Sequence, residues 1–333
     1  MGRRGSRGSR RFGAAFWAAL LLGIVTLTAL VLQIPGAEEK LTSVLGGVFR
    51  PGALASGHLG PLSVTLGDLG HADPDACEVH VLDVGQADCI LVRQGAHAML
   101  IDTGEPENGQ MVVDYLKSLG VRRLDCLVLT HPHADHIGGA EEVLKAVRTE
   151  QVILSHAAQT TRLYERVLDT IEAQGIPVRQ AKPGDSYALG DAVYTILSPD
   201  PGTEYDNVND YSVALRLSYG ELSMVFTGDM GTGPEAEIQA RGLEVDADVL
   251  KAGHHGSASA SSQAFLDAVS PAVIVVTCAA DSEDRLPNER ILERFRAAGA
   301  AVFRSDEDGL IVLRFKDGQI TVWSARASGA CSR

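Results

Sequence analysis

Thr130-His131-Pro132-His133-Ala134-Asp135-His136-Ile137-Gly138-Gly139 is the stretch of sequence that decides the fold. Residues 124–129 precede it and form an apolar run that is typical of a buried strand. Pro132 has no N–H to give to a sheet, so the strand is predicted to end before it. Residues 140–147 then have helical spacing. Three imidazoles and a carboxylate are therefore expected in one strand-to-helix turn, at the sheet edge where α/β proteins bind ligands.

This turn has the residue types of a metal site. His131 and His133 are two residues apart and can converge on one cation, whereas the adjacent Asp135 and His136 are expected to diverge and hold a second cation nearby. Zinc suits this mixture of imidazole and carboxylate, and manganese or iron would also be accepted. The Gly138-Gly139 pair is expected to leave room for backbone near the ions, at a helix N-terminus that tolerates an anion. A polar loop that is rich in histidine by chance is the competing interpretation.

The N-terminal part of the chain predicts a membrane anchor and a linker. Residues 1–11 are rich in arginine, and the uncharged residues 12–34 have about the length of a transmembrane helix. The arginines place the N-terminus in the cytoplasm and the rest of the chain outside it, as a single-pass protein of the cell membrane. A cleavable signal peptide, which would give a secreted protein, is the alternative. Residues 35–76, rich in Gly, Pro, Ala and Ser, are predicted to be a linker.

Composition narrows the function classes. The 333-residue chain is 45% hydrophobic, which is enough for one large core. Its net charge is −14, and −19 without the five arginines of the first eleven residues. An acidic body argues against a broad basic groove for nucleic acid, although metal ions can reverse the sign locally. Of five cysteines, Cys89, Cys126 and Cys278 are predicted to be buried, while Cys77 and Cys331 are able to pair if the domain is exported.

The rest of the chain alternates between strands and helices. Grouped strands with helices between them occur twice, which predicts two sheets packed face to face with helices outside. Strands are expected at 78–82, 89–93, 98–102, 124–129, 151–155, 192–197, 213–217, 224–227, 249–251, 273–277, 302–304, 310–315 and 320–323, and helices at 108–119, 140–147, 161–174, 235–240, 262–269 and 288–298.

Other polar residues also follow predicted strands. Asp229, in Thr-Gly-Asp, can reach the same sheet edge, where it would bridge two metals; taken alone, it is an ordinary turn aspartate. The His254-His255 pair lies in a glycine-flanked loop and is expected to supply one ligand and one residue that supports a ligand or contacts substrate, or else to be merely exposed. Three acidic residues at strand ends are predicted to orient ligands by hydrogen bonding: Asp83, Asp88 and Asp102.

Together these motifs resemble the metallo-β-lactamase superfamily, and within it the hydrolase domain of the ComEC-type competence family. The resemblance covers about residues 77–325 and leaves 326–333 as a tail. It implies an α/β fold, an αββα metallo-β-lactamase-like sandwich of two mixed sheets with outer helices, preceded here by one transmembrane helix. The matching segments are 82–88, 101–104, 131–139, 209–213, 227–229, 254–257 and 302–311.

The resemblance also implies two divalent metal ions. Zinc is the expected metal, with manganese as the alternative, since the candidate ligands offer nitrogen and oxygen donors. The family's last ligand histidine is typically followed by glycine, which selects His255 over His254. The superfamily's additional histidine before Asp229 has no counterpart, and Asn209 lies in that segment, so the first site is predicted to have fewer ligands. The implied assignments are His131 and His133 to the first metal, Asp135, His136 and His255 to the second, and Asp229 to both.

Water activated by the cations is expected to attack a phosphorus or carbonyl centre. The main hypothesis is a phosphodiesterase, with a phosphate ester such as single-stranded DNA as substrate and no identifiable protein partner. An envelope phosphoesterase of the phosphorylcholine type and a non-catalytic metal-binding module of a DNA-uptake assembly are the alternatives. The predicted catalytic residues are Asp135 and His254, and the predicted substrate contacts are Asn209, Ser212, Lys251 and Ser257.

Overall fold

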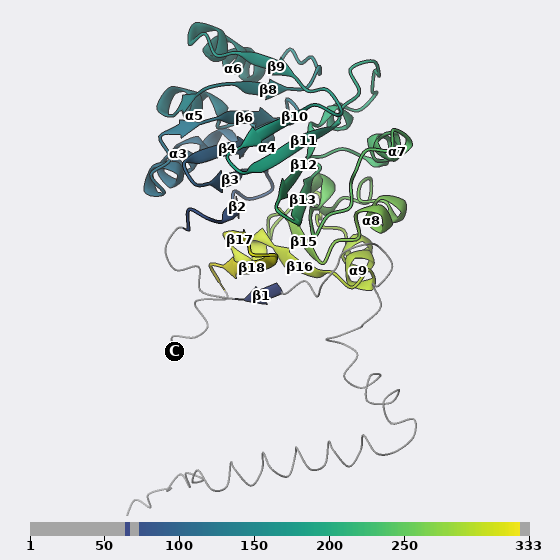
Figure 1. Ribbon diagram of the computed structural model, residues 1–333. Coiled ribbons are helices and arrows are strands. Elements are labelled where there is room, and N and C mark those ends of the chain that lie inside the picture. Colours follow the sequence, from purple (N-terminus) through teal and green to yellow (C-terminus); the bar gives the residue numbers. More distant parts are fainter. Residues whose placement is uncertain (1–63, 67–72, 327–333) are drawn as a thin grey trace, which may run out of the picture. The chain divides into compact units, whose positions relative to one another are not determined.

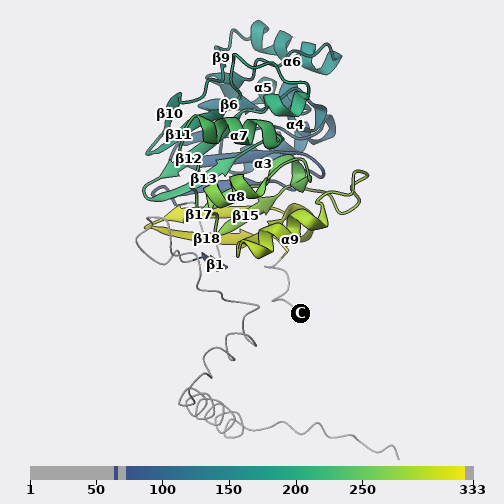
Figure 2. The same cartoon turned by 90° about the vertical axis from the view of Figure 1, so that its right-hand side faces the viewer.

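The computed structural model describes residues 64–66 and 73–326 of the chain. Within them, two large sheets face each other and helices cover their outer sides (Figures 1 and 2). The metallo-β-lactamase-like sandwich of two mixed sheets, predicted from the sequence, is therefore confirmed.

The first sheet, counted over the described residues, has nine strands in the order β1-β18-β17-β2-β3-β4-β6-β8-β9. Neighbours from β18 to β4 are antiparallel, whereas β4, β6, β8 and β9 run parallel, as do β1 and β18. The strands are β1 (Val64–Leu66), β2 (Cys77–Val81), β3 (Ile90–Gln94), β4 (His97–Ile101), β6 (Cys126–Leu129), β8 (Val152–Leu154), β9 (Val178–Gln180), β17 (Ile311–Lys316) and β18 (Gln319–Ser324).

The second sheet, over the same residues, has seven strands in the order β10 to β16, antiparallel from β10 to β13 and parallel from β13 to β16. These strands are β10 (Ser186–Leu189), β11 (Ala192–Ser198), β12 (Ala214–Tyr219), β13 (Leu222–Phe226), β14 (Val249–Lys251), β15 (Val273–Val276) and β16 (Ala301–Arg304). A separate two-stranded pair joins β5 (Arg123–Leu124) to β7 (Arg148–Thr149).

The helices divide between the two outer faces. Residues of α3, α5 and α6 pack on the first sheet, and residues of α7, α8 and α9 pack on the second. The helices are α3 (Gly109–Ser118), α4 (Ala134–Ile137), α5 (Ala140–Ala146), α6 (Arg162–Ala173), α7 (Thr232–Ala240), α8 (Gln263–Val269), α9 (Glu289–Ala297) and α10 (Ser305–Asp308), with short 3-10 turns η1 (Pro106–Asn108), η2 (Val208–Tyr211) and η3 (Gly253–Gly256).

The core lies between the sheets and continues under the helices. In β3, Ile90 and Val92 face the other sheet, while Leu91 points outward and packs with residues of α3 and α5. Alternation along a strand places successive side chains on opposite faces, so a central strand covered on both sides becomes apolar throughout. This explains why the strands before the candidate metal ligands read as continuous apolar runs.

Several elements differ from the sequence predictions. Strand β1 lies inside the range 35–76 that was assigned to a linker, and it pairs with β18. Strands β9 and β10 were missed because they are short and mostly exposed, so they lack an apolar run. The predicted turn after β6 contains the one-turn helix α4.

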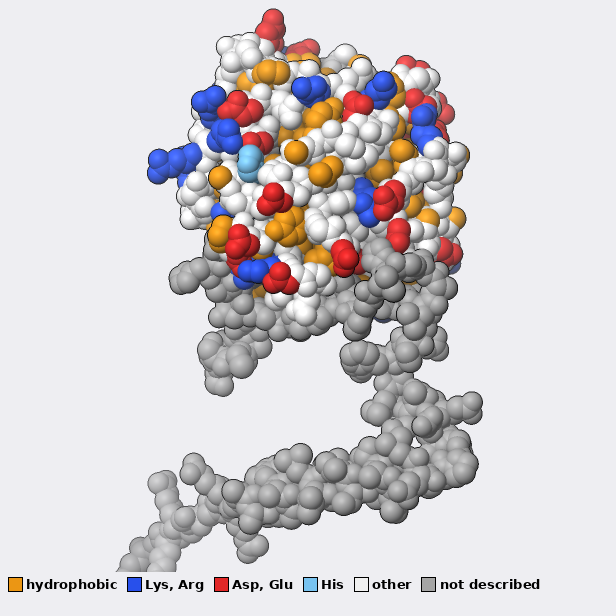
Figure 3. Space-filling model, viewed as in Figure 1, with side chains coloured by type: hydrophobic (Ala, Val, Ile, Leu, Met, Phe, Trp, Pro, Cys, Tyr) orange, Lys and Arg blue, Asp and Glu red, His pale blue; other side chains and the backbone are white. Residues whose placement is uncertain are grey.

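The predicted anchor, 12–34, and Cys331 lie outside the described residues. Among residues 64–66 and 73–326, every helix is too short or too polar to span a bilayer. Cys77 is buried in β2 as a free thiol. On the face drawn in Figure 3, the described acidic and basic side chains are interspersed rather than gathered into one basic patch.

Candidate metal centre

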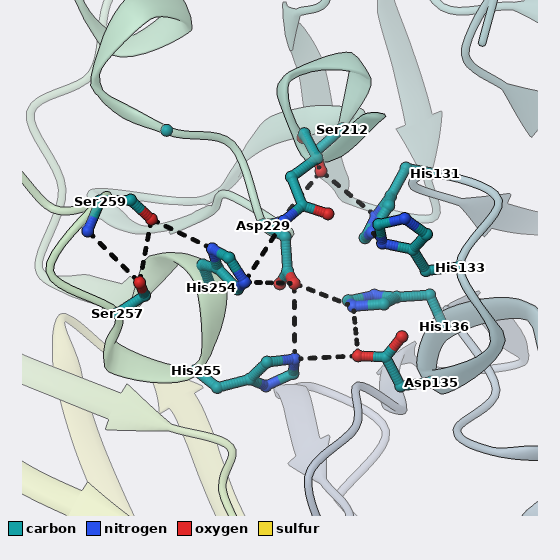
Figure 4. Close-up of polar contacts among 12 residues, drawn as sticks. His131, His133, Asp135, His136, Ser212, Asp229, His254, His255, Ser257 and Ser259 are labelled. Atoms are coloured by element: carbon teal, nitrogen blue, oxygen red, sulfur yellow. Dashed lines mark hydrogen bonds and ion pairs between the residues drawn. The ribbon is translucent and has the colours of Figure 1, made fainter. Parts of the chain in front are cut away.

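The predicted ligands meet at one edge of the sandwich. The turn after β6 carries His131, His133 and His136, the residue three positions after β13 is Asp229, and the turn after β14 carries His255. All of these strands end at the same edge because they run in parallel within their sheets. Figure 4 shows Asp229 in the middle of the group, between the histidines of the two sheets.

Four of these residues form a compact cluster. Asp135, His136, Asp229 and His255 each offer one ligand atom, and these atoms all lie within 4.8 Å of one another. Nε2 of His136 is 3.3 Å, and Nε2 of His255 is 3.5 Å, from Oδ2 of Asp229. The prediction that Asp135 and His136 diverge is wrong: Oδ2 of Asp135 and Nε2 of His136 are 3.4 Å apart, because both side chains of α4 turn toward Asp229 and His255.

Hydrogen bonds fix which nitrogen of each histidine faces the cluster. His136 Nδ1 lies 2.8 Å from Asp102 Oδ2, and the same carboxylate accepts from Thr130 Oγ1 at 2.7 Å. His255 Nδ1 donates to the Thr277 carbonyl at 3.0 Å. A protonated Nδ1 leaves Nε2 unprotonated and free to bind a cation, which is the arrangement that ligand histidines require.

A second group of atoms lies beside the cluster. His131 Nε2 is 3.0 Å from His133 Nδ1, so these two nitrogens converge. His131 Nδ1 lies 3.1 Å from Thr130 Oγ1, which again turns Nε2 toward the site. The distances from Asp229 to His136 and His255 both involve its Oδ2, so its Oδ1 remains for the other side.

The residues fit a metal, as judged by the buried polar atoms that lack partners. His136 Nε2, His255 Nε2 and Asp229 Oδ1 are buried in the described structure without a hydrogen-bond partner. Buried polar atoms are rarely left unpaired, since each costs about 1–3 kcal/mol. Because all three atoms belong to residues of the compact cluster, a shared metal ion explains them better than three independent defects would.

The electrostatics of the cluster also favour positive charge. Burial would raise the pKa of Asp229, but His255 and His136 outweigh burial and hold it well below its usual range. Burial opposes charge on His136, yet Asp229 and Asp102 outweigh it and raise the pKa of His136. At His131 burial prevails and lowers the pKa, which keeps this imidazole neutral, as a metal ligand must be.

Asp88 connects the two sheets behind the ligands. Its Oδ1 accepts from Thr277 Oγ1 at 2.5 Å, and its Oδ2 pairs with Lys251 Nζ at 2.8 Å. Its backbone N–H donates to the Asp135 carbonyl, and its carbonyl accepts from Gly104 N–H. Asp88 therefore supports ligand-bearing segments of both sheets, as a residue predicted to orient ligands should. The prediction that Lys251 contacts substrate is wrong, because its side chain is fully buried in this ion pair.

Two further predictions need correction. Asp83 was expected to orient a ligand, but it is exposed and pairs with Arg326, since its side chain points away from the sheet edge. Ser212 was expected to contact substrate, but it is fully buried, donates to the Asn209 carbonyl and accepts from Asp229 N–H. Ser212 thus holds the backbone of the site together.

The role predicted for Gly138-Gly139 is also wrong. A Cβ at Gly138 would lie 2.3 Å from the backbone of Glu105 and Pro106, and one at Gly139 would lie 2.7 Å from the Thr103 carbonyl. These glycines therefore make room for the neighbouring loop and not for an ion. Close packing of this loop holds the α4 segment against the end of β4.

The remaining predicted residues lie beside Asp229, with His254 between Asn209 and two serines. His254 is half-buried, with Nε2 3.8 Å from Asp229 Oδ2 and 3.2 Å from Asn209 Nδ2. Its Nδ1 is 3.2 Å from Ser259 Oγ, which in turn lies 2.9 Å from Ser257 Oγ. His254 and His255 both have positive φ, 48° and 52°, and this backbone turn points the two imidazoles in different directions.

The sequence interpretation missed Thr130 and Thr277, which hold Asp102, His131 and His255 in place. Each threonine directly follows a buried strand, β6 or β15, at the edge that carries the ligands. This position, directly after a predicted buried strand, was the signal in the sequence that could have identified both threonines. His156 donates to the Thr203 carbonyl and contacts the ring of Tyr211 edge to face, so it stabilises a loop.

Comparison with known families decides the classification. The family model described as the metallo-beta-lactamase superfamily matches residues 82–277, more than half of the chain. The chain belongs to this superfamily. A divalent metal site and a metal-dependent hydrolase are what this membership supports, with the cluster around Asp229 as the candidate site.

The curated relatives that match include a protein named as a competence protein. ComE operon protein 3 of Bacillus subtilis (strain 168) is 28% identical over 263 residues, covering 72% of this chain and 33% of that protein. Competence protein ComA of Neisseria gonorrhoeae is 32% identical over 235 residues, covering 70% of this chain and 31% of that protein. The chain thus spans about a third of the length of these relatives, and it resembles the hydrolase domain of the ComEC-type family.

Among solved structures, CmlA, a diiron beta-hydroxylase from Streptomyces venezuelae, aligns with a TM-score of 0.50 at 15% identity. The alignment covers 74% of this chain and 55% of CmlA. This likeness concerns the fold alone.

Proposed function

We propose that this chain is a metal-dependent phosphodiesterase that acts on nucleic acid. The observation that carries the proposal is the convergence of His136 Nε2, His255 Nε2 and Asp229, all buried, at one point beside Asp135. The similarity to a protein named for competence supports nucleic acid as the substrate class, and we propose single-stranded DNA as the substrate.

In this proposal His131, His133 and Asp229 would hold one divalent cation, and Asp135, His136, Asp229 and His255 would hold the other. Divalent cations bound in such a site act as Lewis acids, lower the pKa of water and neutralise charge on phosphoryl oxygens. Zinc and manganese both suit the donor set. The protein residues around the ligands keep the geometry ready for the reaction.

The chain's own residues supply orientation and contact with substrate. Asp102 and the Thr277 carbonyl hold the Nδ1 protons of His136 and His255, so that both Nε2 atoms stay turned inward. His254 is placed to contact an anionic oxygen or the leaving group, since it is half-buried and lies beside Asp229. Ser257 is a further substrate contact in this proposal.

The proposal includes an extracytoplasmic location, with residues 12–34 as a membrane anchor. The arginines of residues 1–11 and the uncharged stretch that follows support it. Fractionation of cells and protease treatment of spheroplasts test this part: a domain that stays in the membrane fraction and is cleaved from outside is the expected result.

The test of activity uses the purified chain with added Mn²⁺ or Zn²⁺ and three substrates. These are single-stranded DNA, bis-p-nitrophenyl phosphate and p-nitrophenyl phosphorylcholine. Turnover of the first two is expected. Turnover of the third alone would instead indicate the envelope phosphoesterase, and bound metal without turnover of any substrate would indicate a non-catalytic module.

Variants connect activity to the site. His131→Ala and Asp229→Asn are expected to lower both the bound metal, measured by elemental analysis, and the turnover of bis-p-nitrophenyl phosphate. His97→Ala is the matched control, because His97 pairs with Asp125 at the start of β4, opposite the strand end that leads to Asp102. Full activity of Asp229→Asn would refute the proposal.

A further inference from the structure

Asn209 has a buried oxygen that the site described so far does not explain. Its side chain is 8% exposed, and its Oδ1 is buried without a hydrogen-bond partner in the described structure. Leaving a buried amide oxygen without a partner destabilises the fold by about 1–3 kcal/mol. A partner from outside the protein, such as a bound ion, would remove this cost. Asn209 also lies in the segment where the first metal, held by His131 and His133, lacks a protein ligand.

The other end of the amide is already engaged. Asn209 Nδ2 lies 3.2 Å from His254 Nε2, and His254 Nδ1 lies 3.2 Å from Ser259 Oγ. If His254 Nδ1 carries the ring proton and donates it to Ser259, His254 Nε2 accepts from the amide. The amide nitrogen thus points to His254, and the carbonyl oxygen is left to face elsewhere.

The hydroxyl of Ser212 connects Asn209 to two ligands of the proposed first metal. Ser212 Oγ donates to the Asn209 carbonyl at 2.7 Å, accepts from Asp229 N–H at 3.0 Å and lies 3.3 Å from His131 Nδ1. Asn207 caps this turn through a hydrogen bond from Asn209 N–H at 3.1 Å. One buried hydroxyl therefore fixes Asn209, Asp229 and His131 relative to one another.

Asp229 has a matching free atom. Its Oδ2 lies 3.3 to 3.5 Å from His136 and His255, whereas its Oδ1 is buried without a partner, like Oδ1 of Asn209. Two unpartnered oxygens, Asn209 Oδ1 and Asp229 Oδ1, therefore belong to residues that Ser212 Oγ connects to His131, whose Nε2 converges with His133 Nδ1. Both oxygens accept and neither donates, which suits a cation and excludes an anion.

We propose that Asn209 Oδ1 is a ligand of the first metal ion and takes the place of the superfamily's additional histidine. The inference rests on the proposed function for the presence of two metals. The first site then has two nitrogen and two oxygen donors. Amide and carboxylate oxygens are hard ligands, so this site accepts Mn²⁺ more readily than a site with three imidazoles would.

Titration of the metal-free full chain with Mn²⁺ tests the assignment. Electron paramagnetic resonance counts the bound ions from the signal of the unbound Mn²⁺, and the spectrum of the bound ions shows whether they are magnetically coupled. We expect two ions per wild-type chain and a spectrum of a magnetically coupled pair. Asn209→Ala is expected to raise the dissociation constant of one ion by about tenfold or more, the lower range for a disturbed metal shell, and to remove the coupling. Asn209→Asp, which keeps the oxygen, is expected to keep both ions.

His254→Ala separates ligation from an indirect effect through the imidazole. It removes the amide's hydrogen-bond partner and is expected to retain two coupled ions. Retention of one ion by Asn209→Ala shows that this variant is folded. The assignment is overturned if Asn209→Ala binds two ions with unchanged affinity, or if the wild type binds only one. A wild type that binds none overturns the proposed function as well.

Discussion

Lys251→Met tests the reassignment of Lys251 from substrate contact to buried support. Lys251 Nζ lies 2.8 Å from Asp88 Oδ2, with the two side chains 0% and 2% exposed, and it also donates to the Ala252 carbonyl. Methionine keeps much of the volume but leaves the Asp88 carboxylate buried, with Thr277 and His255 as its remaining side-chain partners. Breaking a buried ion pair on one side costs about 3–5 kcal/mol, which is the expected loss in free energy of unfolding.

Urea unfolding of the metal-free chain, followed by circular dichroism, measures this loss. Lys316→Met is the matched control, because its ion pair with Asp73 is exposed to solvent and is expected to contribute little to stability. Asp88→Asn combined with Lys251→Met removes both charges, and we expect the double variant to be more stable than Lys251→Met alone. A loss below about 1 kcal/mol for Lys251→Met, or a double variant less stable than the single one, would refute the reasoning.

Two further predictions concern acid stability and packing. Burial raises the pKa of Glu78, but hydrogen bonds with His80 and Arg314 outweigh it, so the folded pKa lies below 4.5. This stabilisation is present above about pH 4.5 and is lost as the pH falls through the lowered pKa. In Glu78→Gln, the free energy of unfolding measured with urea should therefore decrease less between neutral and acid pH than in the wild type. An unchanged pH dependence would contradict this. Gly138→Ala places a Cβ 2.3 Å from backbone and should cost about 1–3 kcal/mol or more in thermal unfolding, whereas Gly233→Ala, with open space around it, should cost nothing measurable.

The sequence was sufficient for the layers and for most of the residues that meet at the candidate metal centre. Apolar runs followed by His, Asp or Gly located the strand ends, because a strand buried on both faces leaves a clear signal. The sequence could not show which way a side chain turns after such a strand. Asp83 and Asp88 look alike in the sequence, yet one pairs with Arg326 at the surface and the other with Lys251 in the interior.

Residues that act through long-range contacts were also beyond sequence reasoning. Thr277 lies 189 positions from Asp88, and no local pattern relates the two. The helical turn of α4 was missed because four residues are too few for a period to be seen. In both cases the decisive information is tertiary.

The division of the ligands between the two sheets has a mechanical consequence. His131 and His136 belong to one sheet, whereas Asp229 and His255 belong to the other, so any sliding of one sheet over the other changes the spacing of the donors. The apolar layer that joins Val92 and Met224 therefore sets how tightly that spacing is kept. The packing of residues far from the site thus controls the spacing of the metal-binding atoms. Looser packing is expected to lower, before anything else, the selectivity of the site among metal ions.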